Sequence, residues 1–476
     1  MQRKNILFAF LFLIALCLIL WYFLQKPQAT EPAPVEQTTT QTTNPKDCLA
    51  DPTWFPHAST QEPDADKFQS VSNCVFHQWS WQTFLWLTQE VNNQPRFMAF
   101  TNPLQLIGMK PDGFTPRMSK SHDPETFNEF LQAGSDAILV DHNGRPVYYS
   151  QYLDTDFVKF IENNKLTDPN IVKNFDATKS FPNGATELKA TWKIVRSGED
   201  ASQFFTTRTL VNKLKNQDGN IVISPDETEE VTVALVGFHI AGVVEGHPEM
   251  IWATFEHKLN APNVPQNVTP DTEILTPDTV ISHTNYTFYT ANTAYKDCNV
   301  NVANTPNQKL DEATQTLTPI TQVCRQYQYG NDPESPLDRK DKIAQNDHNI
   351  AQLNASVLSK LNPGDVWSNY YQVGAIWFGA IDGLKPNMAF DTDELLTGSL
   401  KLSNATIETF TQSQSTVNNC FRCHNTKQLF PPSNDLNPLP GLNINISHAF
   451  VNIYFWSQEK LIAGNNKQEN ATGVAQ

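Results

Sequence analysis

Near its C terminus the chain contains the run Cys420-Phe421-Arg422-Cys423-His424. Two thiols at this spacing can both reach the vinyl groups along one edge of a porphyrin, and the imidazole that follows can then lie under the iron. The run therefore predicts one covalent haem c, held by Cys420 and Cys423 and ligated by His424. No other feature constrains the fold as strongly, because the chain must close around a porphyrin at this point.

Two other uses of paired cysteines fit the surrounding sequence less well. A thioredoxin-like dithiol would be expected within a strand–helix–strand pattern and would not need His424. A zinc site would need a second pair of cysteines or histidines at ligand spacing, and the sequence offers none. Haem attachment is therefore the favoured interpretation of the motif.

The ligand on the other side of the iron is less constrained. Small c-type cytochromes usually use a methionine or histidine that follows the motif, but no methionine follows His424, and the nearest, Met388, precedes it. His448 is the only histidine after the motif, and prolines between the two would let the chain turn over the porphyrin edge. We expect His448 to be the second axial ligand. The alternative is a five-coordinate iron that is open to a small molecule.

The N terminus predicts a membrane anchor. Arg3 and Lys4 precede an uncharged apolar run at 6–24, which is just long enough to cross a bilayer as a helix. Basic residues in front of such a run predict a cytoplasmic N terminus. We expect residues 1–24 to form one transmembrane helix and residues 25–47, rich in Thr, Gln and Pro, to form a disordered linker. A cleaved signal peptide is the alternative, although no small-residue cleavage site follows.

The remaining cysteines indicate an oxidising compartment. Apart from Cys17 in the apolar run and the two in the motif, four remain, and the two local pairings are Cys48–Cys74 and Cys298–Cys324. We expect both disulfides, with buried thiols as the alternative. Disulfides, haem c and an N-terminal anchor are together consistent with a body in the bacterial periplasm that is tethered to the inner membrane.

The charge balance bears on the partners. The chain has 34 basic and 50 acidic residues, which gives a net charge of −16 at pH 7. This balance disfavours nucleic acid and anionic membrane surfaces as the main partner. It favours a redox partner protein with a basic docking face, because such a partner would be attracted over a distance.

Hydrophobic patterning predicts an α+β fold that is rich in antiparallel sheet. The aromatic-rich residues 72–89 predict a buried helix, and the composition of 230–244 and 250–257 predicts a strand pair. The dipeptide Asn143-Gly144 predicts a hairpin. Further elements are expected as a strand at 190–195, polar loops and short strands at 262–336, and helices at 341–361, from 402 to 411 and at 447–458.

These elements suggest a division of the chain. We expect a large α+β domain at 48–400, a small helical haem lobe at 401–465 and a disordered tail at 466–476. The lobe is short for a free-standing cytochrome, so it is expected to pack on the large domain, with Met388 or Trp377 closing the pocket.

Three blocks of sequence together resemble a little-characterised family of bacterial cytochrome c proteins. The blocks are 246–257 (Gly-His-Pro-Glu-Met-Ile-Trp-Ala-Thr-Phe-Glu-His), 402–410 (Leu-Ser-Asn-Ala-Thr-Ile-Glu-Thr-Phe), and 419–424 together with Ile446-Ser447-His448. Residues 78–84 are similar to an early aromatic helix of that family. The resemblance implies a large N-terminal region followed by one C-terminal haem motif, and it supplies no substrate.

The first of these blocks also raises the question of a second metal. Glu249 and His257 could share one face of a strand, where side chains two residues apart point the same way. Glutamate–histidine pairs at a strand end more often form a hydrogen bond that fixes a turn, and this is the interpretation we favour.

Three functions are compatible with these patterns. One haem on a tethered periplasmic body predicts an electron carrier. The large domain exceeds what a carrier needs, which favours the alternative of an oxidoreductase whose large domain binds a substrate and passes electrons to the haem. Against that alternative, no nucleophile–base pair, phosphate loop or flavin fingerprint is visible. A gas or redox sensor with an open iron is the second alternative.

Overall fold

The structure is a computed structural model that describes residues 47–69, 72–107, 131–135, 137–265, 275–300, 308–332, 340–390, 393–431 and 434–472. Within this range the chain from Asp47 onward forms one compact unit. The expected anchor at 1–24 and the expected linker up to residue 46 lie outside the described residues. Among the helices that are described, none is long and apolar enough to cross a membrane.

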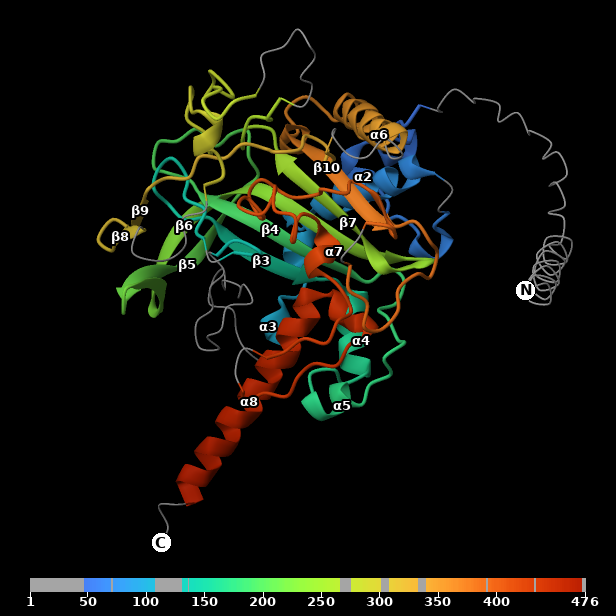
Figure 1. Ribbon diagram of the computed structural model, residues 1–476, viewed down its shortest axis with the longest axis vertical. Helices are drawn as coiled ribbons and strands as arrows, with labels where there is room; N and C mark the ends of the chain where they lie inside the picture. The colour runs from blue at the N-terminus through green and yellow to red at the C-terminus, as the bar shows by residue number, and fades with distance from the viewer. Residues whose placement is uncertain are drawn as a thin grey trace, which may run out of the picture. The chain divides into compact units, whose positions relative to one another are not determined.

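A seven-stranded sheet, in which every pairing is antiparallel, organises the unit (Figure 1). Its path runs β11-β10-β7-β6-β4-β3, and β5 pairs with the first half of β6. The strands are β3 (Tyr148–Leu153), β4 (Thr186–Ile194), β5 (Thr206–Gln217), β6 (Asn220–Val244), β7 (His247–His257), β10 (Tyr370–Phe378) and β11 (Leu396–Gly398). The expected α+β class with a large antiparallel sheet is confirmed.

One face of the sheet packs on two helices that are far apart in sequence. Strand residues such as Trp192, Phe238 and Phe255 form a core there with aromatic side chains of α2 (Asn73–Thr88) and apolar residues of α6 (Lys340–Leu358). Figure 1 shows α2 and α6 side by side. The dense apolar pattern at 72–89 predicted a buried helix, and α2 is buried along most of its length.

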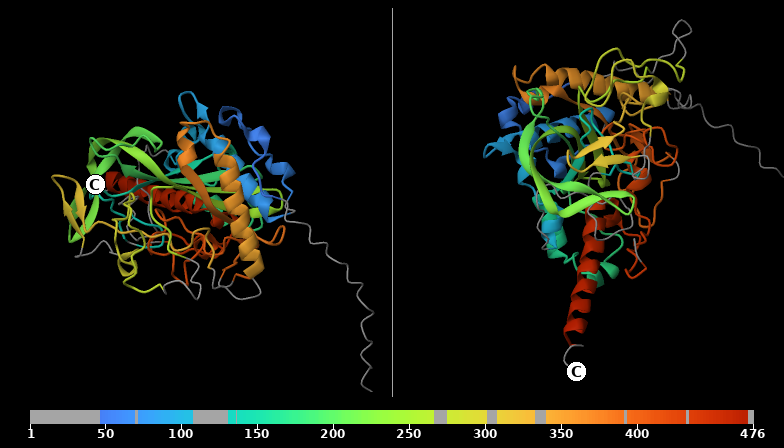
Figure 2. Two further views of the ribbon diagram at one scale, coloured as in Figure 1. Left: turned by 90° about the horizontal axis from the view of Figure 1, so that it is seen from above. Right: turned by 90° about the vertical axis from the view of Figure 1, so that its left-hand side faces the viewer.

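The opposite face carries the C-terminal part of the chain. A second core joins strand residues such as Ala241 and Trp252 to the helices α4 (Thr155–Asn163) and α5 (Pro169–Lys173) and to the C-terminal helices. These are the short α7 (Cys420–Cys423) and α8 (His448–Thr472), which extends away from the sheet (Figures 1 and 2). The C-terminal segment therefore packs on the sheet, as expected for the lobe.

The remaining elements are short. They are α3 (Pro103–Leu106), the strand pairs β1 (Glu90–Val91) with β2 (Gln94–Pro95) and β8 (Lys309–Asp311) with β9 (Thr316–Thr318), and single 3-10 turns at Pro52–Trp54, His57–Ser59, Ala65–Lys67, Arg96–Ala99, Tyr295–Asp297, Val366–Asn369 and Asn443–Ile446.

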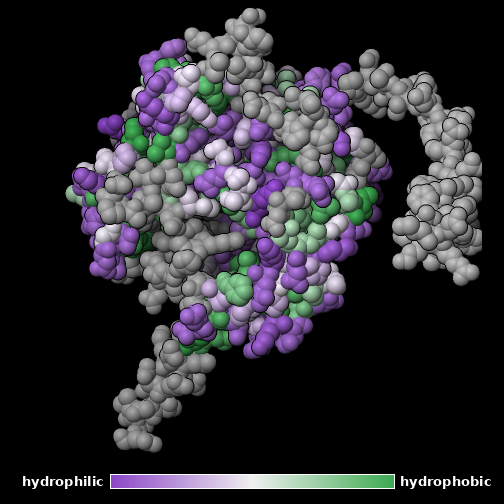
Figure 3. All heavy atoms as spheres, in the orientation of Figure 1, coloured by the Kyte–Doolittle hydropathy of each residue, from purple (hydrophilic) through white to green (hydrophobic). Residues whose placement is uncertain are grey.

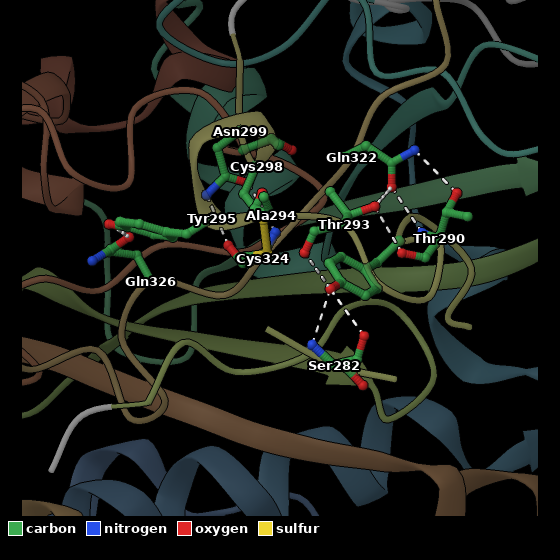
Figure 4. Close-up of a disulfide and its surroundings, with 12 residues drawn as sticks. Ser282, Thr290, Thr293, Ala294, Tyr295, Cys298, Asn299, Gln322, Cys324 and Gln326 are labelled. Atoms are coloured by element: carbon green, nitrogen blue, oxygen red, sulfur yellow. Dashed lines mark hydrogen bonds between the residues drawn. A yellow bond between two sulfur atoms is a disulfide. The ribbon is translucent and has the colours of Figure 1, made fainter. Parts of the chain in front are cut away.

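Both expected disulfides are present, Cys48–Cys74 and Cys298–Cys324. The second holds a loop region in which the Asn299 amide donates to the Cys324 carbonyl (2.8 Å; Figure 4). Because disulfides persist in oxidising surroundings, the two bonds indicate an extracytoplasmic location.

Several expected elements are confirmed with shifted ends. The strand pair is β6 and β7, the expected strand at 190–195 is β4, the helix at 341–361 is α6, and Val140 bridges Pro146 across the Asn-Gly turn. One expectation is wrong, because residues 402–411 form turns and no helix. Residues 466–472 continue α8, and the rest of the expected tail, 473–476, lies outside the described residues. No proline interrupts 459–472, so nothing removes a backbone donor from that helix.

Candidate haem site

Two adjacent cross-strand rows on the second face of the sheet build the floor of the site. The first, which we call the attachment row, consists of Glu187, Ala241, Trp252 and Ile376 on four neighbouring strands. The second, the polar row, is offset from the first by two residues on the shared strands β4, β6 and β7, and it consists of Gln151, Lys189, His239 and Thr254. Side chains two residues apart on a strand share a face, so both rows point to the C-terminal segment.

The haem motif is anchored on the attachment row by its first variable residue. Phe421 is fully buried, and its ring lies 5.0 Å from that of Phe378 and 6.4 Å from that of Trp252. Arg422 forms an ion pair with Asp393 (2.5 Å). These contacts leave Cys420 and Cys423 lining a cavity of about 690 Å³, within the usual range for cofactor pockets.

His424 is held in an orientation that suits metal binding. Its Nδ1 donates a hydrogen bond to the carbonyl of Ile446 (2.9 Å), because a carbonyl oxygen can only accept. A neutral imidazole that donates through Nδ1 carries its lone pair on Nε2. The ring also lies 4.0 Å from Trp252. A backbone carbonyl behind the ring is the usual support of an iron-ligating histidine.

His448 lies beside His424, with the two imidazole rings stacked at 3.6 Å between centroids and 23° between planes. Its Nε2 donates to the Cys423 carbonyl (3.3 Å). The structure brings the two predicted ligands together, and the role of His448 as the second axial ligand stays a prediction.

The cavity offers partners for the parts of a haem. Arg422 is nine-tenths buried, and its Nε and Nη1 have no hydrogen-bond partner in the described part of the chain. These donors fit a carboxylate such as a haem propionate. Burial, with the carboxylate of Glu408 adding to it, holds the pKa of the Cys420 thiol well above its ordinary value. Both thiols and Arg422 line this one cavity, an arrangement that fits haem attachment.

A second pair of polar groups lines the same cavity. Nε2 of His239, on the polar row, contacts both carboxylate oxygens of Glu408 (3.0 and 3.2 Å). Burial would raise the pKa of Glu408, but His239 and Lys189 outweigh it, and the pKa lies below its ordinary value. The pair was not predicted, because 169 residues separate its members and no local pattern links them.

Some expected contributors lie elsewhere. Neither Met388 nor Trp377 lines the cavity. Trp377 stacks on Phe76 on the opposite face of the sheet, since its neighbour Ile376 takes the face of the attachment row. His247 forms a hydrogen bond with Glu249 (2.8 Å), while His257 contacts the Gln203 carbonyl at the other end of β7. Over the described ranges no group of three or more His, Cys, Asp or Glu side chains could hold a metal ion.

No protein-family profile, curated protein or solved structure matches this chain. The resemblance to a bacterial cytochrome c family therefore stays a prediction.

Proposed function

We propose that this protein is a single-haem c-type cytochrome that transfers electrons, with haem c attached to Cys420 and Cys423 and ligated by His424. The main support is that both thiols and the His424 imidazole line one cavity. Nδ1 of that imidazole donates a hydrogen bond to the Ile446 carbonyl. When bound, the haem would supply reversible one-electron chemistry at its iron.

The residues of the chain have distinct parts in this proposal. The Ile446 carbonyl fixes the tautomer of His424 and makes Nε2 a better donor to iron. Trp252 and Phe421, both buried, exclude water from the attachment side of the cavity. Because a drier surrounding disfavours the more highly charged ferric site, this packing would tune the reduction potential.

We also propose where this protein is located and which kind of partner it has. The oxidising compartment would be the bacterial periplasm, with the body tethered to the inner membrane by a helix at 1–24 whose N terminus is cytoplasmic. The partner would be a redox protein with a basic docking face, since the chain carries a net charge of −16. Among the coloured residues of the face in Figure 3, hydrophilic ones predominate and the hydrophobic areas are separated.

A spectroelectrochemical titration of the full chain, produced together with a haem-attachment apparatus, tests the electron-transfer proposal. We expect one reversible transition with the slope of a single electron and the same curve in both directions. Haem that cannot be cycled, or that is destroyed by one reduction, would contradict it.

Exposure of the reduced protein to CO tests the ligand set separately. If His448 is the second axial ligand, the reduced wild type will not bind CO and reduced His448→Ala will bind it. If the wild type binds CO, the bis-histidine prediction is wrong, and His448 supports His424 through the stacked contact seen here.

A further inference from the structure

The pair formed by His239 and Glu408 has the geometry of a proton acceptor. Nε2 donates to the Glu408 carboxylate, so a neutral His239 carries its lone pair on Nδ1. Nδ1 has no hydrogen-bond partner in the part of the chain that the structure describes, and it is not among the buried unsatisfied atoms, so it can be reached from the cavity. A carboxylate behind an imidazole both orients the ring and stabilises its protonated form.

The pair of His239 and Glu408 lies near the haem motif. His239 is on the polar row, and its neighbour two residues along β6, Ala241, pairs with Trp252, whose ring contacts His424. Residues two apart on a strand are separated by only about 7 Å. Glu408 and Cys420 line the same cavity, so the carboxylate lies on the side of the haem motif as well. The pair therefore lines the space next to the predicted iron ligand rather than a remote surface.

A positive group adjoins the pair. Lys189 is the direct cross-strand partner of His239, its ammonium lies over the ring of Tyr149 (5.0 Å), and it lines the same cavity. Glu408 accepts the hydrogen bond from His239, and Lys189 supplies a positive charge on the strand next to His239. An anion formed beside His239 would be attracted by Lys189, and the proton released would be held by the imidazole.

We propose that His239, oriented by Glu408, accepts a proton from a small weak acid, HX, that enters the cavity beside the haem, and that Lys189 stabilises the resulting anion. The inference rests on the proposed haem site. The bond between hydrogen and X breaks, the proton moves to Nδ1 of His239, the electron pair stays on X, and nothing is oxidised or reduced. This acid–base site would make the large domain a ligand-binding part of the protein and not only a scaffold.

Hydrogen cyanide is a suitable probe, because it is protonated near neutral pH and must lose its proton to bind as cyanide. The experiment uses the full haem-loaded chain and follows the association rate of cyanide with the oxidised protein by haem absorbance. CO association with the reduced protein is the matched control, because CO carries no proton. The variants are His239→Gln, Glu408→Gln, Glu408→Asp and, as a cavity-rim control, Gln428→Ala, whose side chain is exposed.

Each variant has a defined expected result. In His239→Gln, cyanide association should fall by at least about 100-fold, the usual contribution of a general base, while CO association is unchanged. Glu408→Gln should lower the cyanide rate, and Glu408→Asp should restore part of it. Gln428→Ala should leave both rates unchanged.

Three results would overturn the inference while the covalent haem is intact. The first is a His239→Gln variant that binds cyanide as fast as the wild type. The second is a parallel fall in the CO rate, which would indicate a structural effect on access. The third is a wild type that binds neither ligand. A chain that carries no covalent haem would instead contradict the proposed function. Failure of the acid–base inference and failure of the proposed function are therefore distinguishable.

Discussion

Gly237 lies where the turn segment before the haem motif packs tightly against the sheet. It is on β6, two residues from His239, and a methyl group added there would lie within 3.0 Å of side-chain atoms of Thr406 and Asn404. Real Cβ atoms essentially never make such contacts, so the segment would have to move. We predict that Gly237→Ala both destabilises the protein and disturbs the pair of His239 and Glu408.

The magnitude follows from what the methyl group displaces. The Asn404 amide donates to Thr254 Oγ1 and to the Phe255 carbonyl (both 3.0 Å), and the Asn404 backbone N–H donates to Glu408 (2.8 Å). Overpacking costs about 1–3 kcal/mol, and each buried hydrogen bond that is weakened adds about 1 kcal/mol. We expect Gly237→Ala to lower the free energy of unfolding by about 2–4 kcal/mol.

Urea denaturation followed by fluorescence measures this loss. Gly379→Ala is the matched control, because it adds the same methyl group at the end of β10, where the nearest atom is 3.9 Å away. Thr406→Ala in the Gly237→Ala background should recover part of the stability, since it removes one of the clashing atoms. If Gly237→Ala costs no more than Gly379→Ala, or if the double variant shows no recovery, the methyl group does not clash with this segment.

Three further predictions concern the rest of the unit. Burial raises the pKa of Asp154 to about 7, so between about pH 4 and pH 7 the folded state keeps a proton that the unfolded chain has lost. The free energy of unfolding therefore falls as the pH rises through this range. Asp154→Asn should remove about 2–4 kcal/mol of that fall, measured by urea denaturation at pH 4 and pH 8. An equal pH dependence in both proteins would contradict this. Glu256→Gln should cost about 3–5 kcal/mol in the same assay, because it leaves the buried guanidinium of Arg325 without its carboxylate; a cost below that of an exposed ion pair would rule out the buried pairing. Replacing Cys48 and Cys74 by alanine should lower the free energy of unfolding by about 2–4 kcal/mol, and a denaturation curve that does not change on reduction of the wild type would argue against that bond.

Local patterns predicted much of this fold. The aromatic density of α2, the strand composition of β6 and β7 and the spacing of the cysteines each act over a short stretch, and each has the structure expected of it. β10 was not predicted, although its residues Tyr370–Phe378 have the aromatic and branched composition of a strand.

The part that failed depends on contacts between distant residues. The spacing of 402–411 suggested a helix, but the Asn404 side chain accepts from the Thr406 N–H and bonds to β7, which gives the backbone an alternative to helical hydrogen bonds. The position of Glu408 opposite His239 follows from that irregular turn. No sequence pattern within either segment could have predicted the pair.

The mass of the intact, unfolded and reduced chain shows whether haem is attached at Cys420 and Cys423. We predict that the full chain, produced with a haem-attachment apparatus, carries the added mass of one haem, and that the Cys420→Ser, Cys423→Ser double variant carries none. A wild-type chain without that mass, or a double variant that retains it, would contradict attachment of haem at this motif.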